Sequence, residues 1–281
     1  MRIVEKSKKK CMEILGGRES FQGSYVMPRL EMEIQSQLAQ NNLKGGGEVH
    51  YVSACASGRI TRVMLADICA TRELFHNVSQ TLRRNLIQKI NSIWHNQIVK
   101  RTNQQLAKFA EQGCYASASL ATFFAPTRTL SICNAGNPPP LMYRARTQQW
   151  SVLHGEPQPQ KWQAAQGGTL NLSEYRHQKV RLSTGDIVLL MGNGFTQSAL
   201  PCGGLANHQK FVELANQRTG DDPMDTAKEI IGHVCGNSQP CEDRTVIIFK
   251  VTSSRVPLLD SVLAPLRMLR GAADSTRLQS L

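Results

Sequence analysis

Oxygen-bearing side chains stand at four points of the chain where a strand-like run begins, ends or meets a turn. The candidates for chemistry are Glu48, Asp67, Asn193, Glu242 and Asp243. Carboxylate and amide oxygens are the ligands that hard divalent cations such as Mg²⁺ and Mn²⁺ prefer. If the fold brings these points together, they form a metal site that needs no cluster of histidine or cysteine.

The segment from Gly185 to Gln197 places an amide where such a site would call for a carboxylate. Its apolar run, Ile187–Met191, is short and bounded by glycines, which is typical of a buried strand. A strand end followed by Asp-Gly commonly aims a carboxylate at a metal, but residue 193 is asparagine. Asn193 can offer a carbonyl oxygen without a negative charge. Alternatively, it is a turn residue that tolerates left-handed geometry between Gly192 and Gly194.

The first two carboxylates belong to a predicted hairpin. Glu48 to Cys55 and Ile60 to Ala66 are apolar runs, and Ala56-Ser57-Gly58-Arg59 between them is rich in turn formers. Glu48 opens the first run after Gly45-Gly46-Gly47, and Asp67 closes the second. This pairing predicts two carboxylates at one end of a sheet.

Further strands and helices follow along the chain. Helical periodicity covers Arg72 to Gln112, with a break near residues 91–97, and recurs at 207–216 and 224–234, where Asp222 is the expected N-cap. The other predicted strands are Tyr115–Ala125, Thr129–Cys133, Leu141–Ala145, Trp150–Leu153, Tyr175–Leu182, Ile187–Met191 and Val246–Val251. The Gly- and Pro-containing residues 154–172 are predicted to form a loop.

The two ends are predicted to lie outside the main domain, which we place at residues 45–251. Residues 1–44 are interpreted as an N-terminal extension with a basic head and no strong periodicity. Residues 252–281 are interpreted as a C-terminal tail. Its amphipathic piece, Val256–Leu269, favours either a partner-binding helix or a loosely ordered extension.

Composition excludes some functions. The 281 residues are 41% hydrophobic and 19% charged, and no apolar run is long enough to span a membrane. No secretion signal is recognised, which favours the cytoplasm. The eight cysteines contain no CxxC pair, so buried thiols are preferred over zinc or disulfides. The net charge of +12 suits acidic partners. Nucleic acid is disfavoured as a partner because the basic clusters lack interleaved aromatic residues.

The order of these motifs resembles the PPM-type metal-dependent protein serine/threonine phosphatases, in the branch of the bacterial stage II sporulation phosphatase. The similarity covers about residues 45–251 and rests on Gly-Gly-Glu48, the strand with Asp67, Asn-Ala-Gly-Asn137-Pro-Pro-Pro, Gly-Asn193-Gly and Glu242-Asp243-x-Thr245. The resemblance implies an α+β fold, an antiparallel β-sandwich flanked by helices on both outer faces. It also implies two Mn²⁺ or Mg²⁺ ions that activate a water to hydrolyse phosphoserine or phosphothreonine in a phosphorylated protein.

Carried over residue by residue, the resemblance makes metal ligands of Glu48, Asp67, Asn193, Glu242 and Asp243. The chain departs from the family pattern at several of these motifs. Glu48 and Glu242 replace aspartates, Asn193 replaces the third aspartate, and Asn137 replaces a histidine. The Gly-His-Gly that should follow Asp67 is missing. Two hypotheses therefore remain: a metal-dependent phosphatase, and a pseudophosphatase that keeps the fold as a binding or regulatory module.

Overall fold

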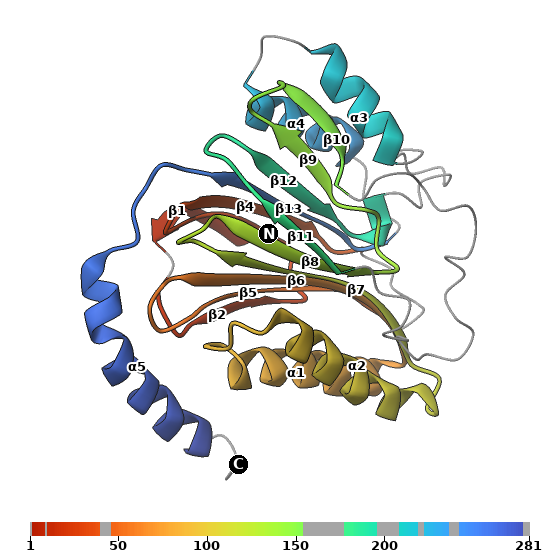
Figure 1. Cartoon of the computed structure of the whole chain (residues 1–281). Helices are drawn as coiled ribbons and strands as arrows, with labels where there is room; N and C mark the ends of the chain where they lie inside the picture. The colour runs from red at the N-terminus through yellow and green to blue at the C-terminus, as the bar shows by residue number, and fades with distance from the viewer. Residues whose placement is uncertain are drawn as a thin grey trace.

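The computed structural model describes residues 2–8, 10–39, 46–153, 177–195, 208–218, 222–235 and 242–277. Two β-sheets lie face to face, and helices cover the outer face of each (Figure 1). This arrangement confirms the predicted α+β sandwich. The predicted loop at 154–172, Gly203-Gly204, and Cys202 and Cys241 lie outside the described residues.

One sheet carries the strand that ends at Asn193. Its order is β1 (Arg2–Lys8), β3 (Phe21–Met27), β4 (Leu30–Gln37), β13 (Arg244–Val251), β12 (Ile187–Met191), β9 (Leu141–Arg144) and β10 (Gln149–Val152). Neighbouring strands are antiparallel, except that β1 runs parallel to β3. All five residues of β12 are buried, as expected for a short apolar strand covered on both faces.

The other sheet carries Glu48 and Asp67. Its order is β11 (His177–Arg181), β8 (Thr129–Ala135), β7 (Tyr115–Phe124), β6 (Ile60–Cys69), β5 (Gly47–Ala54) and β2 (Ile14–Gly17), with all pairs antiparallel. β5 and β6 form the predicted hairpin around residues 55–59.

The helices seal the two outer faces. α1 (Arg72–Gln88) and α2 (His95–Ala110) pack on the sheet that contains β5, and α3 (His208–Gln217) and α4 (Pro223–Cys235) pack on the other (Figure 1). The break predicted near residues 91–97 separates α1 from α2. The backbone N–H of Met224 donates to the Asp222 carboxylate at 2.7 Å, which confirms the predicted N-cap.

The central core fills the space between the sheets. It includes Met32, Val63, Phe123, Val188 and Phe249, each 3% exposed or less. In β4 the buried and half-buried residues alternate strictly, so every second side chain enters this core.

The N-terminal residues contribute more regular structure than the sequence analysis found. The chain up to residue 44 was interpreted as an extension without periodicity, yet it contains β1 to β4. β4 pairs with β13 and β2 pairs with β5, so both sheets include N-terminal strands. Leu30, Met32 and Ile34 alternate with polar residues, which is the period-two pattern of a half-buried strand, whereas the sequence analysis found no strong periodicity here.

The C-terminal tail contains α5 (Leu258–Arg277), which runs down one side of the molecule (Figure 1). Arg267 holds it to the β5–β6 turn by donating to the carbonyl of Ala56 at 2.9 Å. The predicted amphipathic piece is thus helical, and Val262 and Leu269 on it are exposed; the partner-binding role of this helix stays a prediction. Within the described ranges, no helix combines the length and apolar character that crossing a membrane requires.

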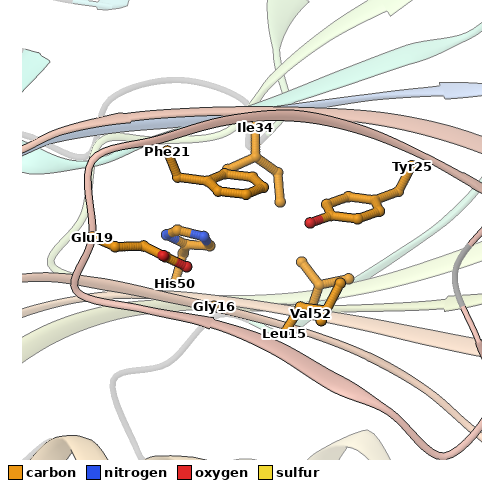
Figure 2. A pocket seen from close by; sticks show the side chains of 8 residues that line it. All are labelled: Leu15, Gly16, Glu19, Phe21, Tyr25, Ile34, His50 and Val52. Carbon is orange, nitrogen blue, oxygen red and sulfur yellow. The ribbon is translucent and has the colours of Figure 1, made fainter. Parts of the chain in front are cut away.

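A small cavity interrupts the core near β2. Figure 2 shows His50, Glu19 and the hydroxyl of Tyr25 facing it, together with Phe21 and other apolar side chains. Burial lowers the pKa of His50 to about 4, so its imidazole is neutral at pH 7. Its Nδ1 atom is buried without a hydrogen-bond partner.

Of the cysteines, Cys55, Cys114 and Cys133 are buried and Cys11 and Cys69 are half-buried, and none of these five forms a disulfide. Burial raises the pKa of the Cys133 thiol to about 12. Cys133 and Cys114 are thus small buried side chains, whereas Cys55 also accepts a hydrogen bond from the Ile60 N–H at 3.2 Å through its sulfur.

Candidate metal centre

Glu48 and Asp67 lie opposite each other on adjacent strands. They are direct partners in the antiparallel register of β5 and β6, so their side chains project from the same face of the sheet. His50, two residues along β5, lines the cavity between the sheets, and Glu48 therefore also points inward. The predicted pair of carboxylates at one end of the sheet is formed.

The end of β12 meets Glu48 across the gap between the sheets. The backbone N–H of Gly194 donates to Glu48 Oε1 at 3.1 Å. A Cβ atom at Gly192 would lie 2.1 Å from the same oxygen, which is closer than any real contact. The glycines around Asn193 thus allow the backbone at the end of β12 to approach the Glu48 carboxylate closely.

Glu48 is 2% exposed and has an unusual carboxyl group. Burial, followed by the negative charge of Asp67, raises its pKa well above the ordinary value. Its second oxygen, Oε2, is buried, and the hydrogen bonds from Gly194 and Thr245 lower the pKa by less than burial raises it. Such a group favours its neutral, protonated form unless a cation is close.

Asn193 is oriented as a hydrogen-bond donor. It begins a short 3-10 helix, Asn193–Phe195, which is anchored by the fully buried ring of Phe195. Its Nδ2 donates to Asp67 Oδ2 at 3.0 Å and to Ser117 Oγ at 2.8 Å. Turning the amide over would set its carbonyl oxygen against the Asp67 carboxylate, so the partners fix this orientation.

Asp243 is enclosed by donors on both oxygens. Arg18 reaches it with Nε at 2.7 Å from Oδ2 and with Nη2 at 3.2 Å from Oδ1. The backbone N–H groups of Ala39 and Glu48 donate to Oδ1 and Oδ2 at 2.9 and 3.1 Å. Glu242, the residue before it, is only half-buried. The structure thus orients Asp243 inward and gives Glu242 a more open position.

A chain of small polar side chains continues from Asn193 across β7 and β8. Ser117 donates to Asn137 Oδ1 at 2.6 Å, and Asn137 Nδ2 donates to the Leu65 carbonyl at 3.0 Å and to Ser119 at 3.2 Å. Asn137, which stands in place of the histidine in the family pattern, is buried and ties the loop after β8 to β6 and β7. This network connects the centre to three strands.

The sequence analysis missed Arg18 and Ser117. Arg18 lies in the turn after Gly16-Gly17, and its contact with Asp243 joins residues 225 positions apart. A basic residue in a glycine turn gives no sign of such a partner. Ser117 is the direct partner of Asp67 in the register of β6 and β7, a pairing that its own position in the sequence does not reveal.

These donors and acceptors do not fit a centre for two divalent cations. Asn193 presents N–H groups to the cluster, and both oxygens of Asp243 already accept hydrogen bonds. Within the described segments, no three residues among His, Cys, Asp and Glu are arranged to hold a metal ion. The buried Oε2 of Glu48 is the feature that suits a cation best. The carboxylates converge, but protein groups supply the partners that metals would provide.

The family model for stage II sporulation protein E (SpoIIE) matches residues 70–252, from the end of β6 to the end of β13. This match covers more than half of the chain. The chain belongs to the SpoIIE family. The PPM-type resemblance is therefore confirmed, and the match includes Asn193 and Asp243 but begins after Glu48 and Asp67. No curated protein matches the chain.

Several solved structures share the fold. The RsbU and RsbW domains of a Mycobacterium tuberculosis protein superpose with a TM-score of 0.62 at 18% identity, covering 82% of this chain and 63% of that one. The PP2C phosphatase domain of SpoIIE from Bacillus subtilis, with a fragment of its regulatory domain, gives 0.59 at 15% identity, again covering 82% and 63%. RsbX in complex with magnesium superposes with a TM-score of 0.59 at 12% identity, covering 82% of this chain and 100% of RsbX. This SpoIIE-family chain thus has the PP2C phosphatase fold and spans less than two thirds of the first and second of these proteins.

Proposed function

We propose that this SpoIIE-family domain is a phosphatase-fold binding module that engages a phosphorylated protein or a regulatory partner without two-metal hydrolysis. The observation that carries the proposal is the hydrogen bond from Asn193 Nδ2 to Asp67 Oδ2. At the position where the family pattern has a carboxylate, this chain has an N–H donor that faces the central aspartate. A divalent cation and this N–H group cannot both occupy the same side of Asp67.

The charge of the cluster supports the same proposal. Divalent cations at such a site would supply an activated water and neutralise the phosphoryl oxygens. Their binding depends on how many carboxylates surround them. Here Asn193 contributes no charge and Asp243 is neutralised by Arg18, which leaves only the carboxylates of Glu48 and Asp67 to face two dications. Little negative charge is left to attract two dications.

The partner class follows from the family and the charge of the protein. A net charge of +12 attracts phosphorylated or otherwise acidic proteins. The M. tuberculosis relative combines RsbU and RsbW domains in one chain, which is consistent with a regulatory protein as partner. The division into residues 1–44, 45–251 and 252–281 and the cytoplasmic location remain predictions.

A metal-dependent serine/threonine phosphatase is the second candidate. It is favoured by the convergence of Glu48, Asp67 and Asp243 on one end of the sandwich, since Glu48 and Asp67 are paired and Glu48 N–H contacts Asp243. Two structural relatives were solved with metals, RsbX with magnesium and the M. tuberculosis phosphatase PstP with two manganese ions. In this candidate Mn²⁺ or Mg²⁺ would displace Arg18 from Asp243 and bind Glu48 and Asp67.

Manganese titration and phosphopeptide hydrolysis separate the two candidates. Isothermal calorimetry with Mn²⁺ and phosphate release from a phosphoserine peptide are measured for the wild type, Asn193→Asp and Asp67→Ala. We expect the wild type to match Asp67→Ala in both assays and Asn193→Asp to bind more Mn²⁺. Mn²⁺-dependent turnover by the wild type above the Asp67→Ala control would refute the proposal and establish the phosphatase.

A further inference from the structure

The ion pair between Arg18 and Asp243 does more than join two loops. We propose that Arg18 supplies, from within the chain, the positive charge that a metal ion would otherwise supply at Asp243. The inference rests on the proposed function, and it names the group that makes the carboxylate cluster stable without metal. Arg18 lies between β2 and β3, in residues that the SpoIIE family model does not cover.

Burial makes a cation at Asp243 necessary. The Asp243 side chain is 1% exposed, and an isolated carboxylate at such a position is strongly unfavourable. Arg18 binds through two nitrogens, one on each carboxylate oxygen. This two-point contact gives both charge and direction, which a lysine in the same place would not provide.

The approach of Arg18 is built into the backbone. A Cβ atom at Gly47 would lie 2.4 Å from Arg18 Nε and 2.4 Å from Asp243 Oδ2, so any other residue would collide with the ion pair. Gly47 also has a φ of +153°, which side-chain-bearing residues rarely adopt. The glycine before Glu48 therefore opens the space through which the guanidinium reaches the aspartate.

The Arg18 guanidinium also contacts an aromatic ring on α1. Its guanidinium carbon lies 5.8 Å from the centre of the Phe75 ring on α1, and its side chain is 28% exposed. Arg18 thus connects the helix layer on the β5 side to the loop before β13. Its side chain is the partly exposed member of the ion pair, whereas Asp243 is buried.

A second ion pair of the same kind provides a matched control. Arg144 Nη1 lies 2.9 Å from Asp186 Oδ2, with side-chain exposures of 33% and 1%. Asp186 lies at the start of β12, at the opposite end of that strand from Asn193. Arg144→Gln therefore removes an equally buried partner far from the cluster.

The test compares Arg18→Gln and Arg144→Gln with the wild type. Thermal unfolding is followed without metal and with increasing Mn²⁺, and Mn²⁺ affinity is measured by calorimetry. We expect both variants to lose stability without metal, because each leaves a buried carboxylate without its counter-charge, held by backbone N–H groups. Mn²⁺ should restore the melting temperature of Arg18→Gln but not that of Arg144→Gln. Arg18→Gln should also bind Mn²⁺ at least about tenfold more tightly than the wild type does. Arg18→Lys should bind Mn²⁺ with an affinity between those of the wild type and Arg18→Gln. It takes the place of Arg18→Gln in the test if Arg18→Gln does not fold.

The inference is overturned if Mn²⁺ has the same effect on Arg18→Gln, or on Arg18→Lys, as on Arg144→Gln. That result would leave the proposed function intact as long as the wild type neither binds Mn²⁺ nor hydrolyses the phosphopeptide. Conversely, tight binding of two ions by the wild type would refute the proposed function. The ratio of Mn²⁺ affinities between Arg18→Gln and wild type would still decide the role of Arg18.

Discussion

Replacing Asn193 by aspartate should destabilise the protein in the absence of metal and at neutral pH. The change converts a donor 3.0 Å from Asp67 Oδ2 into a second carboxylate. It removes a hydrogen bond to a charged acceptor, a contribution of about 1.5–3 kcal/mol. It also brings two negative charges together, which at an effective dielectric constant near 20 costs about 5 kcal/mol at this separation.

The full repulsion is not reached, because such a pair can share one proton. The shared proton raises the pKa of the pair in the folded state above that of the unfolded chain. A raised folded pKa means that stability is retained at acidic pH and lost as the pH rises through that pKa. We therefore expect a loss of about 3 kcal/mol at pH 7.5 and a smaller loss at pH 5.

Urea unfolding at the two pH values, with EDTA and then with Mn²⁺, measures this effect. Asn193→Ser is the control, since it loses the amide donor without adding charge. Asn193→Asp should be less stable than Asn193→Ser at pH 7.5 in EDTA and should recover when Mn²⁺ is added. Equal stability of Asn193→Asp and wild type at pH 7.5 without metal would show that residue 193 does not contact Asp67.

Three further predictions follow from contacts around the core. Gly192→Ala should lower the free energy of unfolding by about 1–3 kcal/mol, because its Cβ would collide with the buried Glu48 carboxylate; an unchanged urea midpoint would contradict that approach. Burial lowers the pKa of His50 from 6.5 to about 4, so the contribution of its neutral form to stability is fully present above pH 6.5. The free energy of unfolding should therefore fall by about 3 kcal/mol as the pH falls from 6.5 towards 4. His50→Phe, compared with wild type across this range, should lack that loss. Asp222→Ala removes the N-cap of α4 and should cost about 1 kcal/mol in chemical denaturation, whereas Asp225→Ala, which leaves the cap in place, should cost less.

Local patterns in the sequence were sufficient for most of the architecture. The four-residue spacing of Leu74, Val78 and Leu82 predicted α1, and these side chains are buried against the sheet. The uniformly apolar run of β12 predicted a strand covered on both faces, and the turn residues at 56–59 predicted the β5–β6 hairpin. In each case neighbouring residues share one face, so the signal lies within a few positions of the chain.

The strands β3 and β4 were not predicted from local patterns in the sequence. Leu30, Met32 and Ile34 alternate with polar residues, and their side chains are buried in β4. Tertiary structure gives the hairpin its role, because β4 pairs with β13 over eight residue pairs and joins the start of the chain to its last strand. No local pattern specifies that pairing.

The sequence by itself determined that Glu48, Asp67, Asn193 and Asp243 stand at strand ends and that the third position has lost its carboxylate. Only the tertiary structure decided what each side chain contacts. Arg18 neutralises Asp243 and the Asn193 amide faces Asp67 because the two sheets close on each other and bury the Asp243 carboxylate. A buried charge must find a partner, and that partner can come from any part of the chain that the fold brings near.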